Sequence, residues 1–245
     1  MSTKKTKDFS KPAPSLLFML LFYGGTLMLT LIITPLLISH RTSIWAGHLW
    51  GVYVRAMCRI CGLGYEIKGL PAGGSQAAKT QVIYAIKHQS AWETMVLFSL
   101  LDHPAVVLKK ELMAIPIMGW FFARARHIPV DRKAGLAALK KLQKQAKEAA
   151  DEGRSIMIFP QGTRVLPGQS APYQIGVFAL YQGAQLPVMP IALNSGLFWP
   201  KNALGLNKGT VQVSCLPLIE PGLSRKDFMA RLEEAIESET QRLGG

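Results

Sequence analysis

Two short stretches of the chain could move a proton and hold a phosphate. The first, KHQSAWE (87–93), follows a strand-like apolar run at 81–87. A histidine side chain titrates near neutral pH and can accept a hydroxyl proton. A carboxylate five residues later, brought back by a helical turn, can bind the other ring nitrogen and fix the tautomer. His88 and Glu93 are therefore a candidate general base and its orienting carboxylate, a device that contributes about 10²–10⁴-fold to rate.

The same segment also has a purely structural interpretation. Ser90-x-x-Glu93 matches a capping box, in which the glutamate bonds only to the backbone at the start of a helix. On these residues alone, both interpretations stay open.

The second stretch, FPQGTR (159–164), follows another apolar run. Gly162 allows a tight turn that presents N–H groups, Thr163 offers a hydroxyl, and Arg164 has a planar fork that matches phosphate oxygens. The alternative is an ordinary strand-to-helix turn with a surface arginine. Further cations near predicted strand ends either gather around the same anion or face solvent: Lys110, Arg126 and Arg132.

Several other chemistries lack their motifs. The sequence has no G-x-S-x-G elbow, no Walker loop and no G-x-G-x-x-G fingerprint. No His/Cys cluster has zinc spacing, so we expect no metal site. The three cysteines give no disulfide framework, which favours a reducing compartment. The basic segment 132–147 is either a solvated helix face or a holder for the phosphates of coenzyme A or for an acidic carrier protein.

The elements that would position these groups alternate along the chain. We expect strands at 65–69, 81–87, 105–109, 127–130, 155–160, 187–193 and 210–218, and helices at 91–101, 133–150, 172–182 and 224–243. This alternation predicts an α/β fold with a largely parallel mixed sheet flanked by helices. Ligands of such sheets bind beyond the carboxyl ends of the strands.

The N-terminal quarter has a different character. Residues 1–11 form a basic tail, and no formally charged residue occurs from Pro12 to His40. About 20 apolar residues cross a bilayer as a helix, and this run is too long for a signal peptide core. Residues 42–62 combine Trp, Tyr and Arg in an amphipathic pattern typical of the membrane interface. We expect an anchor at 12–62, either one membrane helix or a two-helix hairpin, before an α/β domain at 63–245.

Composition agrees with a membrane surface. The 28 Lys and Arg against 15 Asp and Glu give a net charge of +13, which suits a polyanionic partner. A hydrophobic share of 49% favours a lipid partner over a nucleic acid. Proteins that bind single-stranded nucleic acids interleave basic and aromatic residues on one surface. This sequence does not, so we expect no nucleic-acid partner.

Taken together, the motifs resemble the glycerolipid acyltransferase family, which includes the 1-acyl-sn-glycerol-3-phosphate acyltransferases. His88-x4-Glu93 is similar to that family's His-x4-Asp, and FPQGTR is similar to its Phe-Pro-Glu-Gly-Thr-Arg. The run from Lys110-Glu111-Leu112 to Arg132 resembles the second block, and VMPIALN (188–194), centred on Pro190, resembles the fourth. All four occur in family order over nearly half the chain.

The resemblance implies acyl transfer from a thioester, acyl-CoA or acyl carrier protein, to the sn-2 hydroxyl of 1-acylglycerol 3-phosphate, without a bound cofactor. It implies His88 as base, oriented by Glu93. It implies a phosphate site formed by Gly162, Thr163, Arg164, Lys110 and Arg126. Gln161 and Pro190 would support the motifs around it. The partners would be membrane lipids, the lysophosphatidate-type acceptor and, for one donor, the carrier protein. The location would be the cytoplasmic face of the inner or cell membrane.

Two departures from the family pattern stand out. Glu93 replaces an aspartate and keeps the carboxylate, whereas Gln161 replaces a glutamate and removes a charge. The motifs indicate acyl transfer more firmly than the acceptor, which could also be glycerol 3-phosphate, another lysophospholipid or a lyso-aminolipid. A catalytically silent lipid-binding protein of the same fold is the rival from another class.

Overall fold

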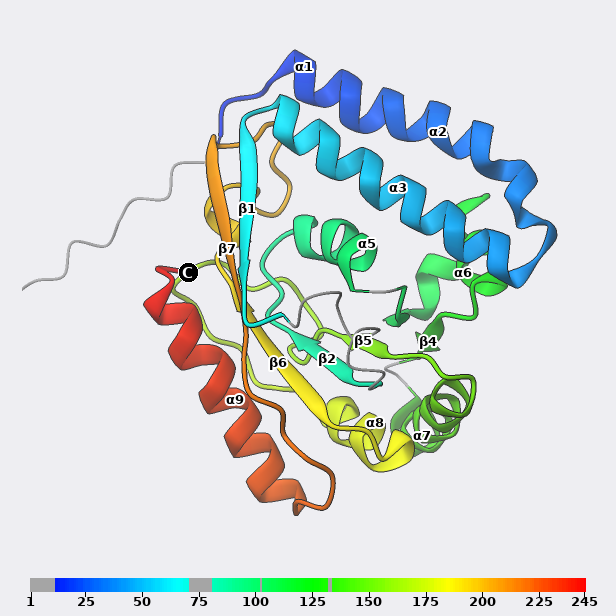
Figure 1. Ribbon diagram of the computed structural model, residues 1–245, viewed down its shortest axis with the longest axis vertical. Helices are drawn as coiled ribbons and strands as arrows, with labels where there is room; N and C mark the ends of the chain where they lie inside the picture. Colours follow the sequence, from blue (N-terminus) through cyan, green and yellow to red (C-terminus); the bar gives the residue numbers. More distant parts are fainter. Residues whose placement is uncertain (1–11, 71–80, 102, 132–133) are drawn as a thin grey trace, which may run out of the picture.

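The computed structural model describes residues 12–70, 81–101, 103–131 and 134–245 (Figure 1). Its centre is a seven-stranded sheet with the order β1-β7-β6-β2-β5-β3-β4. The strands are β1 (Leu63–Lys68), β2 (Ile83–Ile86), β3 (Ala105–Lys109), β4 (Ile128–Val130), β5 (Ile156–Ile158), β6 (Val188–Leu193) and β7 (Gly209–Cys215). Every neighbouring pair is parallel except β6 with β7. The predicted α/β class with a largely parallel mixed sheet is confirmed.

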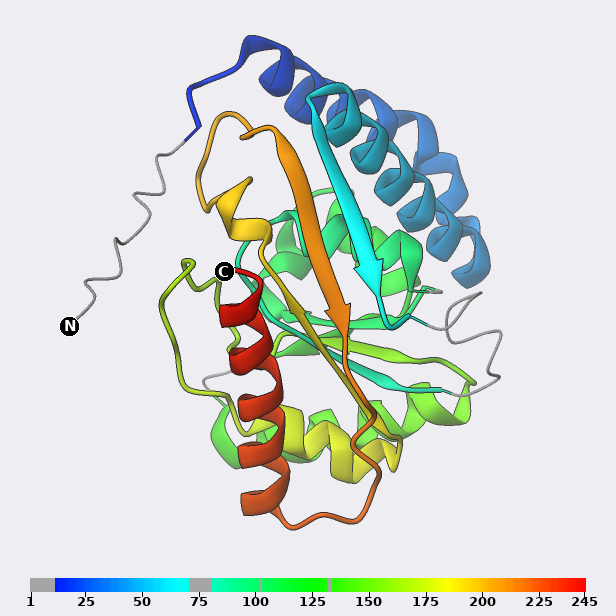
Figure 2. The same cartoon turned by 60° about the vertical axis from the view of Figure 1, so that its left-hand side comes forward.

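Strand β2 shows why the sheet needs helices on both faces. All four of its residues are buried, and successive side chains of a strand point to opposite faces. Ile83 and Ala85 pack into a core with α7 (Gly135–Asp151), α8 (Gly176–Ala184) and α9 (Arg225–Arg242). Tyr84 and Ile86 pack into a second core with the N-terminal helices and the segment after β2. The sheet therefore separates two apolar layers (Figure 2).

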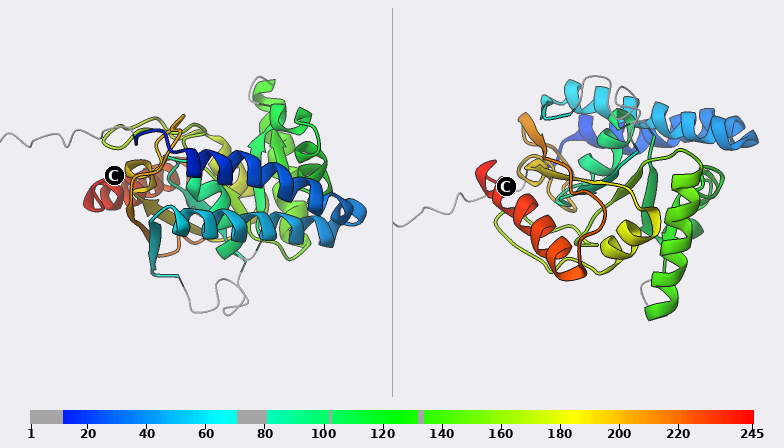
Figure 3. Two further views of the ribbon diagram at one scale, coloured as in Figure 1. Left: turned by 90° about the horizontal axis from the view of Figure 1, so that it is seen from above. Right: turned by 60° about the horizontal axis from the view of Figure 1, so that its bottom comes forward.

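The N-terminal segment is a helical hairpin. The stretches α1 (Leu16–Met19), η1 (Leu20–Gly25), α2 (Thr26–Ile33) and η2 (Thr34–Ile38) run on as one helix, and α3 (His40–Ile60) returns beside it (Figure 3). A capping box between Ser39 and Thr42 starts α3, and the Tyr53 hydroxyl donates to the Leu21 carbonyl at 2.5 Å. Among the described residues, one helix is long and apolar enough to span a membrane, and whether 12–62 enters the bilayer as one membrane helix or as a two-helix hairpin stays a prediction. The division into anchor and α/β domain stays a prediction.

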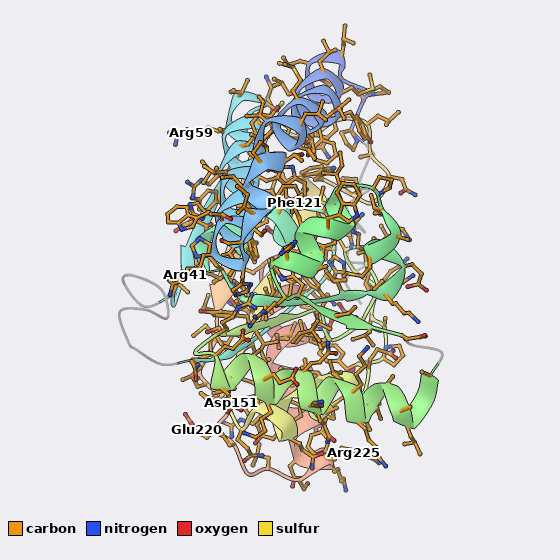
Figure 4. All side chains as sticks on the ribbon, turned by 90° about the vertical axis from the view of Figure 1, so that its right-hand side faces the viewer. Arg41, Arg59, Phe121, Asp151, Glu220 and Arg225 are labelled. Atoms are coloured by element: carbon orange, nitrogen blue, oxygen red, sulfur yellow. The ribbon has the colours of Figure 1, made fainter. Side chains whose placement is uncertain are left out.

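The first arm of the hairpin has an uncovered apolar surface. Leu16–Ile38 is long and apolar enough to cross a membrane. Its most apolar 18-residue stretch has a mean hydropathy of 2.3, and only 11% of that stretch is buried. Exposed side chains continue onto α3, where Trp45 and Leu49 are exposed. The inner side of the hairpin packs on α6 (Met118–Arg124), where Phe121 contacts the cluster of Ile33 and Ala46 (Figure 4).

Most predicted helices occur with shifted ends. The helix expected at 91–101 is η3 (Glu93–Leu97) with α5 (Phe98–Leu100), and the one expected at 172–182 begins only at Gly176. The short helices η4 (Lys110–Ala114) and α6, between β3 and β4, were not expected. They are joined by a close contact, since a Cβ on Gly119 would lie 2.1 Å from the Met113 carbonyl oxygen. A seven-residue helix is too short to show a period in sequence.

A histidine beside β3 makes the fold sensitive to acid. The Val106 N–H donates to His127 Nδ1 at 3.1 Å, which requires the neutral ring. Burial, then the charges of Arg154 and His40, lower the pKa of His127 to about 3. Below about pH 6.5, the ordinary pKa of histidine, His127 is protonated in the unfolded chain but stays neutral in the folded one. The free energy of unfolding therefore falls as the pH drops below that value.

We predict that the free energy of unfolding, measured in detergent, falls between pH 7 and pH 4.5 by about 2 kcal/mol more in the wild type than in His127→Asn. The asparagine side chain does not titrate. Equal pH sensitivity of the two proteins would contradict this role of His127.

Candidate active site

The two chemical motifs meet at one edge of the sheet because their strands are neighbours. His88 follows β2, and the segment from Phe159 to Arg164 follows β5, which lies beside β2. Parallel strands end at the same edge, so the two loops lie together. The contact is direct: the Val165 N–H donates to the His88 carbonyl at 2.8 Å, and the imidazole stacks on Phe159 with ring centroids 4.0 Å apart.

The imidazole of His88 is held by the carboxylate of Glu93. His88 Nδ1 lies 2.9 Å from Glu93 Oε1, with the histidine side chain 13% exposed and the glutamate fully buried. An ionised carboxylate only accepts hydrogen bonds, so it fixes the ring proton on Nδ1. Nε2 is then the nitrogen that can accept a proton from a ligand. The predicted pairing of His88 with Glu93 is present in the geometry.

Glu93 also bonds to the backbone at the start of its own turn. Its Oε1 accepts from the N–H groups of Gln89 at 2.7 Å and Ser90 at 2.6 Å, while Ser90 Oγ accepts from the Trp92 N–H at 3.0 Å. The carboxylate half of the predicted capping box therefore forms, and the serine side chain bonds elsewhere. Capping and orienting the imidazole are done by the same carboxylate, so the two interpretations are not exclusive. The turn that follows, η3, is a π-helix, a feature frequent at functional sites.

Ser195 completes this arrangement. Its hydroxyl donates to Glu93 Oε2 at 2.6 Å, and both residues are fully buried. The neighbouring Gly196 N–H donates to Gln89 Oε1 at 3.1 Å, which ties η6 (Ser195–Leu197) to the His88 turn. Sequence reasoning missed Ser195. The available signal was its place directly after the fourth motif, which ends at Asn194.

A cavity of about 580 Å³ opens beside His88. The polar side chains in its lining belong to His88, Thr94, Lys109, Arg164 and Gln174, and Gly162 contributes main chain. The remaining wall is mainly apolar and comes from β3, β5, α7 and α8, including Val107, Leu139, Leu142, Ile158 and Val177. A base, a guanidinium and a long apolar wall in one cavity suit a ligand with a hydroxyl, an anionic group and a hydrocarbon chain.

The other predicted residues that the structure describes do not line this cavity. Thr163 is exposed beside Arg164, and Lys110 is 66% exposed at the end of β3, where its Nζ donates to Asp131 at 3.2 Å. Gln161 and Pro190 are buried, with Pro190 in β6 opposite Ala85. Arg132 lies outside the described residues. Over the described part of the chain, no group of three or more His, Cys, Asp or Glu could hold a metal ion.

The structure does not bring Arg126 to the cavity. Arg126 precedes β4 and forms an ion pair with Glu152, which precedes β5, and its carbonyl accepts from Arg154 Nη1 at 3.1 Å. These residues sit at the amino ends of parallel strands, the edge opposite the His88 loop. The position of Arg126 directly before the strand expected at 127–130 already indicated this amino-end edge.

Comparison with known proteins gives consistent results. The sequence model of the Acyltransferase family matches residues 70–194. The 1-acyl-sn-glycerol-3-phosphate acyltransferase of Pseudomonas aeruginosa is 34% identical over 218 residues, covering 89% of this chain and 82% of that protein. The enzyme of the same name from Cocos nucifera is 28% identical over 191 residues, 77% of this chain and 60% of its own length. The crystal structure of the 1-acyl-sn-glycerophosphate (LPA) acyltransferase from Thermotoga maritima has the same fold, with a TM-score of 0.67, 18% identity and 93% coverage of both chains.

The buried bond from Ser195 predicts a measurable stability effect. Ser195→Ala leaves Glu93 Oε2 without this donor, and a buried acceptor deprived of its partner costs about 1–3 kcal/mol. Denaturant unfolding in detergent should show that loss. Ser238→Ala, which removes an exposed hydroxyl on α9, is the matched control and should change stability by less than about 0.5 kcal/mol. Equal effects of both substitutions would contradict the role given to Ser195.

Proposed function

The chain belongs to the acyltransferase family, and on this premise we propose that it acylates the sn-2 hydroxyl of 1-acylglycerol 3-phosphate to give phosphatidic acid. The observation that carries the proposal is the His88–Glu93 pair opening onto a cavity that also contains Arg164. A catalytically silent protein would have no need to keep this pair, and both groups are present with hydrogen-bonding geometry.

His88 acts as the general base. With its proton fixed on Nδ1 by Glu93, Nε2 removes the proton of the acceptor hydroxyl as the oxygen attacks the thioester carbonyl carbon. Glu93 stabilises the imidazolium that forms. When the tetrahedral intermediate collapses, the carbon–sulfur bond breaks and the imidazolium returns its proton to the thiolate. No covalent acyl-enzyme is needed in this sequence of steps.

Arg164 binds the phosphate of the acceptor. Arg164 lines the same cavity as His88, so a phosphate bound there by its guanidinium would lie near the base. The Gly162 turn has a φ of 68° and brings main-chain groups beside Arg164. Thr163 and Lys110 are exposed next to the lining residues Arg164 and Lys109, and would add a hydroxyl and an ammonium donor. Arg126 has no part in this site, because it lies at the other edge of the sheet.

The apolar wall holds a hydrocarbon chain, and the thioester comes from acyl-CoA or from acyl carrier protein. Helix α7 supports either donor: Leu139 and Leu142 line the cavity, while its lysines form a basic outer face. Two of these cations, Lys144 and Lys147, pair with Glu148 and Asp151. Exposed bridges of this kind contribute little free energy, so a donor phosphate or an acidic carrier can replace these carboxylates.

The helical hairpin holds this site at a bilayer. Its exposed apolar surface on Leu16–Ile38 enters the lipid, and the net charge of +13 suits an anionic leaflet such as the cytoplasmic one. Arg41 and Arg59 lie near the two ends of α3, where they can reach headgroups (Figure 4). Acceptor and product are both lipids, so neither has to leave the membrane surface.

The mechanism predicts distinct effects of two substitutions in membranes given radiolabelled acyl-CoA and lysophosphatidate. His88→Ala should lower kcat by about 10²–10⁴-fold, the usual contribution of a general base. Glu93→Gln keeps the shape of the side chain but removes its charge, and should lower kcat by at least about tenfold. His40→Ala, at a histidine outside the cavity, is the control. Labelling by His88→Ala equal to that of the wild type would remove the proposed mechanism.

The phosphate site predicts a change in acceptor choice. Arg164→Ala should raise KM for lysophosphatidate by about tenfold or more, since a charge-assisted hydrogen bond is lost. Activity on monoacylglycerol, which has no phosphate, should change little. Arg225→Ala, at the start of α9, is the matched control. An equal loss on both acceptors would argue against a phosphate contact at Arg164.

A further inference from the structure

Three side chains from separate segments converge on the carboxylate of Glu237, on α9. Lys87 Nζ donates to both oxygens at 2.7 Å, the Tyr173 hydroxyl donates to Oε1 at 2.9 Å, and Gln161 Nε2 donates to Oε1 at 3.4 Å. Lys87 continues the face of β2 whose Ile83 and Ala85 lie in the same core as residues of α9. In Figure 1, α9 runs beside β6, the neighbour of β2 in the sheet. Within the described residues, none of these groups lines the cavity, so the cluster lies behind the site.

Gln161 joins this cluster to the catalytic loop. Its Oε1 accepts from the His88 backbone N–H at 3.3 Å, while its Nε2 faces Glu237. A carboxamide can accept with one end and donate with the other, whereas a carboxylate can only accept. As long as position 237 is a carboxylate, the bridge from α9 to the main chain of His88 therefore needs an amide at position 161.

Charge explains why position 161 is neutral in this chain. Lys87 is 1% exposed, and a buried ammonium is strongly unfavourable without a counter-ion. Glu237 supplies that counter-ion from α9. A glutamate at 161, as in the family pattern, would face Glu237 across the 3.4 Å contact, and two carboxylates so close resist being ionised together. Burial, then the charge of Glu237, raises the pKa of Tyr173, which keeps its hydroxyl protonated as a donor.

We propose that Glu237 is a positioning residue of the active site, which balances the charge of Lys87 and, through Gln161, fixes the backbone that carries His88. In this chain the carboxylate expected in the third motif is supplied by α9 instead. The inference rests on the proposed acyl transfer for its kinetic readout, although the network itself is a property of the folded chain.

Exchanging the two groups tests the proposal. Gln161→Glu places two carboxylates together, and Glu237→Gln leaves Lys87 without its counter-ion. Each should lower kcat for lysophosphatidate by about tenfold or more with KM within about threefold, because neither residue lines the cavity. The double variant Gln161→Glu/Glu237→Gln again has one carboxylate and one amide. It should recover kcat to within about threefold of the wild type.

Denaturant unfolding of the same four proteins in detergent supplies a second readout. The double variant should be more stable than either single variant, and Glu234→Gln, which removes an exposed carboxylate of α9, should behave as the wild type. Recovery of stability without recovery of kcat would overturn the positioning role, as would kcat values of the single variants equal to that of the wild type. If the wild type transfers no acyl group, the proposed function fails, while the unfolding cycle still decides whether the network exists.

Discussion

A single buried carboxylate organises the active-site edge of this protein. Glu93 is fully buried and accepts hydrogen bonds from the His88 imidazole, from two backbone N–H groups and from the Ser195 hydroxyl. An ionised carboxylate at such depth is tolerated only when its oxygens are satisfied. The His88 turn, the start of η3 and the turn after β6 are therefore held in one arrangement. The orientation of the His88 imidazole, the proposed base, follows from the need to satisfy this charge.

The sheet makes that arrangement possible. β2 lies between β5 and β6, so the first motif after β2, the third motif after β5 and Ser195 after β6, which itself carries the fourth motif, reach the same place. Residues far apart in sequence thus surround one imidazole without long connections. Lys87 and His88 illustrate the alternation along the strand: one points back to a counter-ion on α9, and the next points to the cavity. Lys87, on one side of the strand end, would thus support the proton transfer proposed for His88 on the other side.

Much of this could be predicted from the sequence, because the signals were local. Apolar β-branched runs gave all seven strands, and the spacing of His88 and Glu93 gave the pair. The failures have different causes. Arg126 looked like a phosphate ligand because it is a cation beside a strand, but it precedes β4 and pairs with Glu152. Ser195 and Glu237 reach the site only through tertiary packing, across 102 and 76 positions from their partners Glu93 and Gln161. The helix α6 is too short for a periodic pattern.

The most direct measurement is an experimental structure with a bound, unreactive analogue of 1-acylglycerol 3-phosphate in which the sn-2 oxygen is retained. That oxygen should lie within about 2.6–3.2 Å of His88 Nε2, as a general base requires. The phosphate should contact Arg164, and the hydrocarbon chain should lie against the wall formed by Leu139 and Val177. A phosphate bound away from Arg164, or an sn-2 oxygen out of reach of Nε2, would contradict the mechanism.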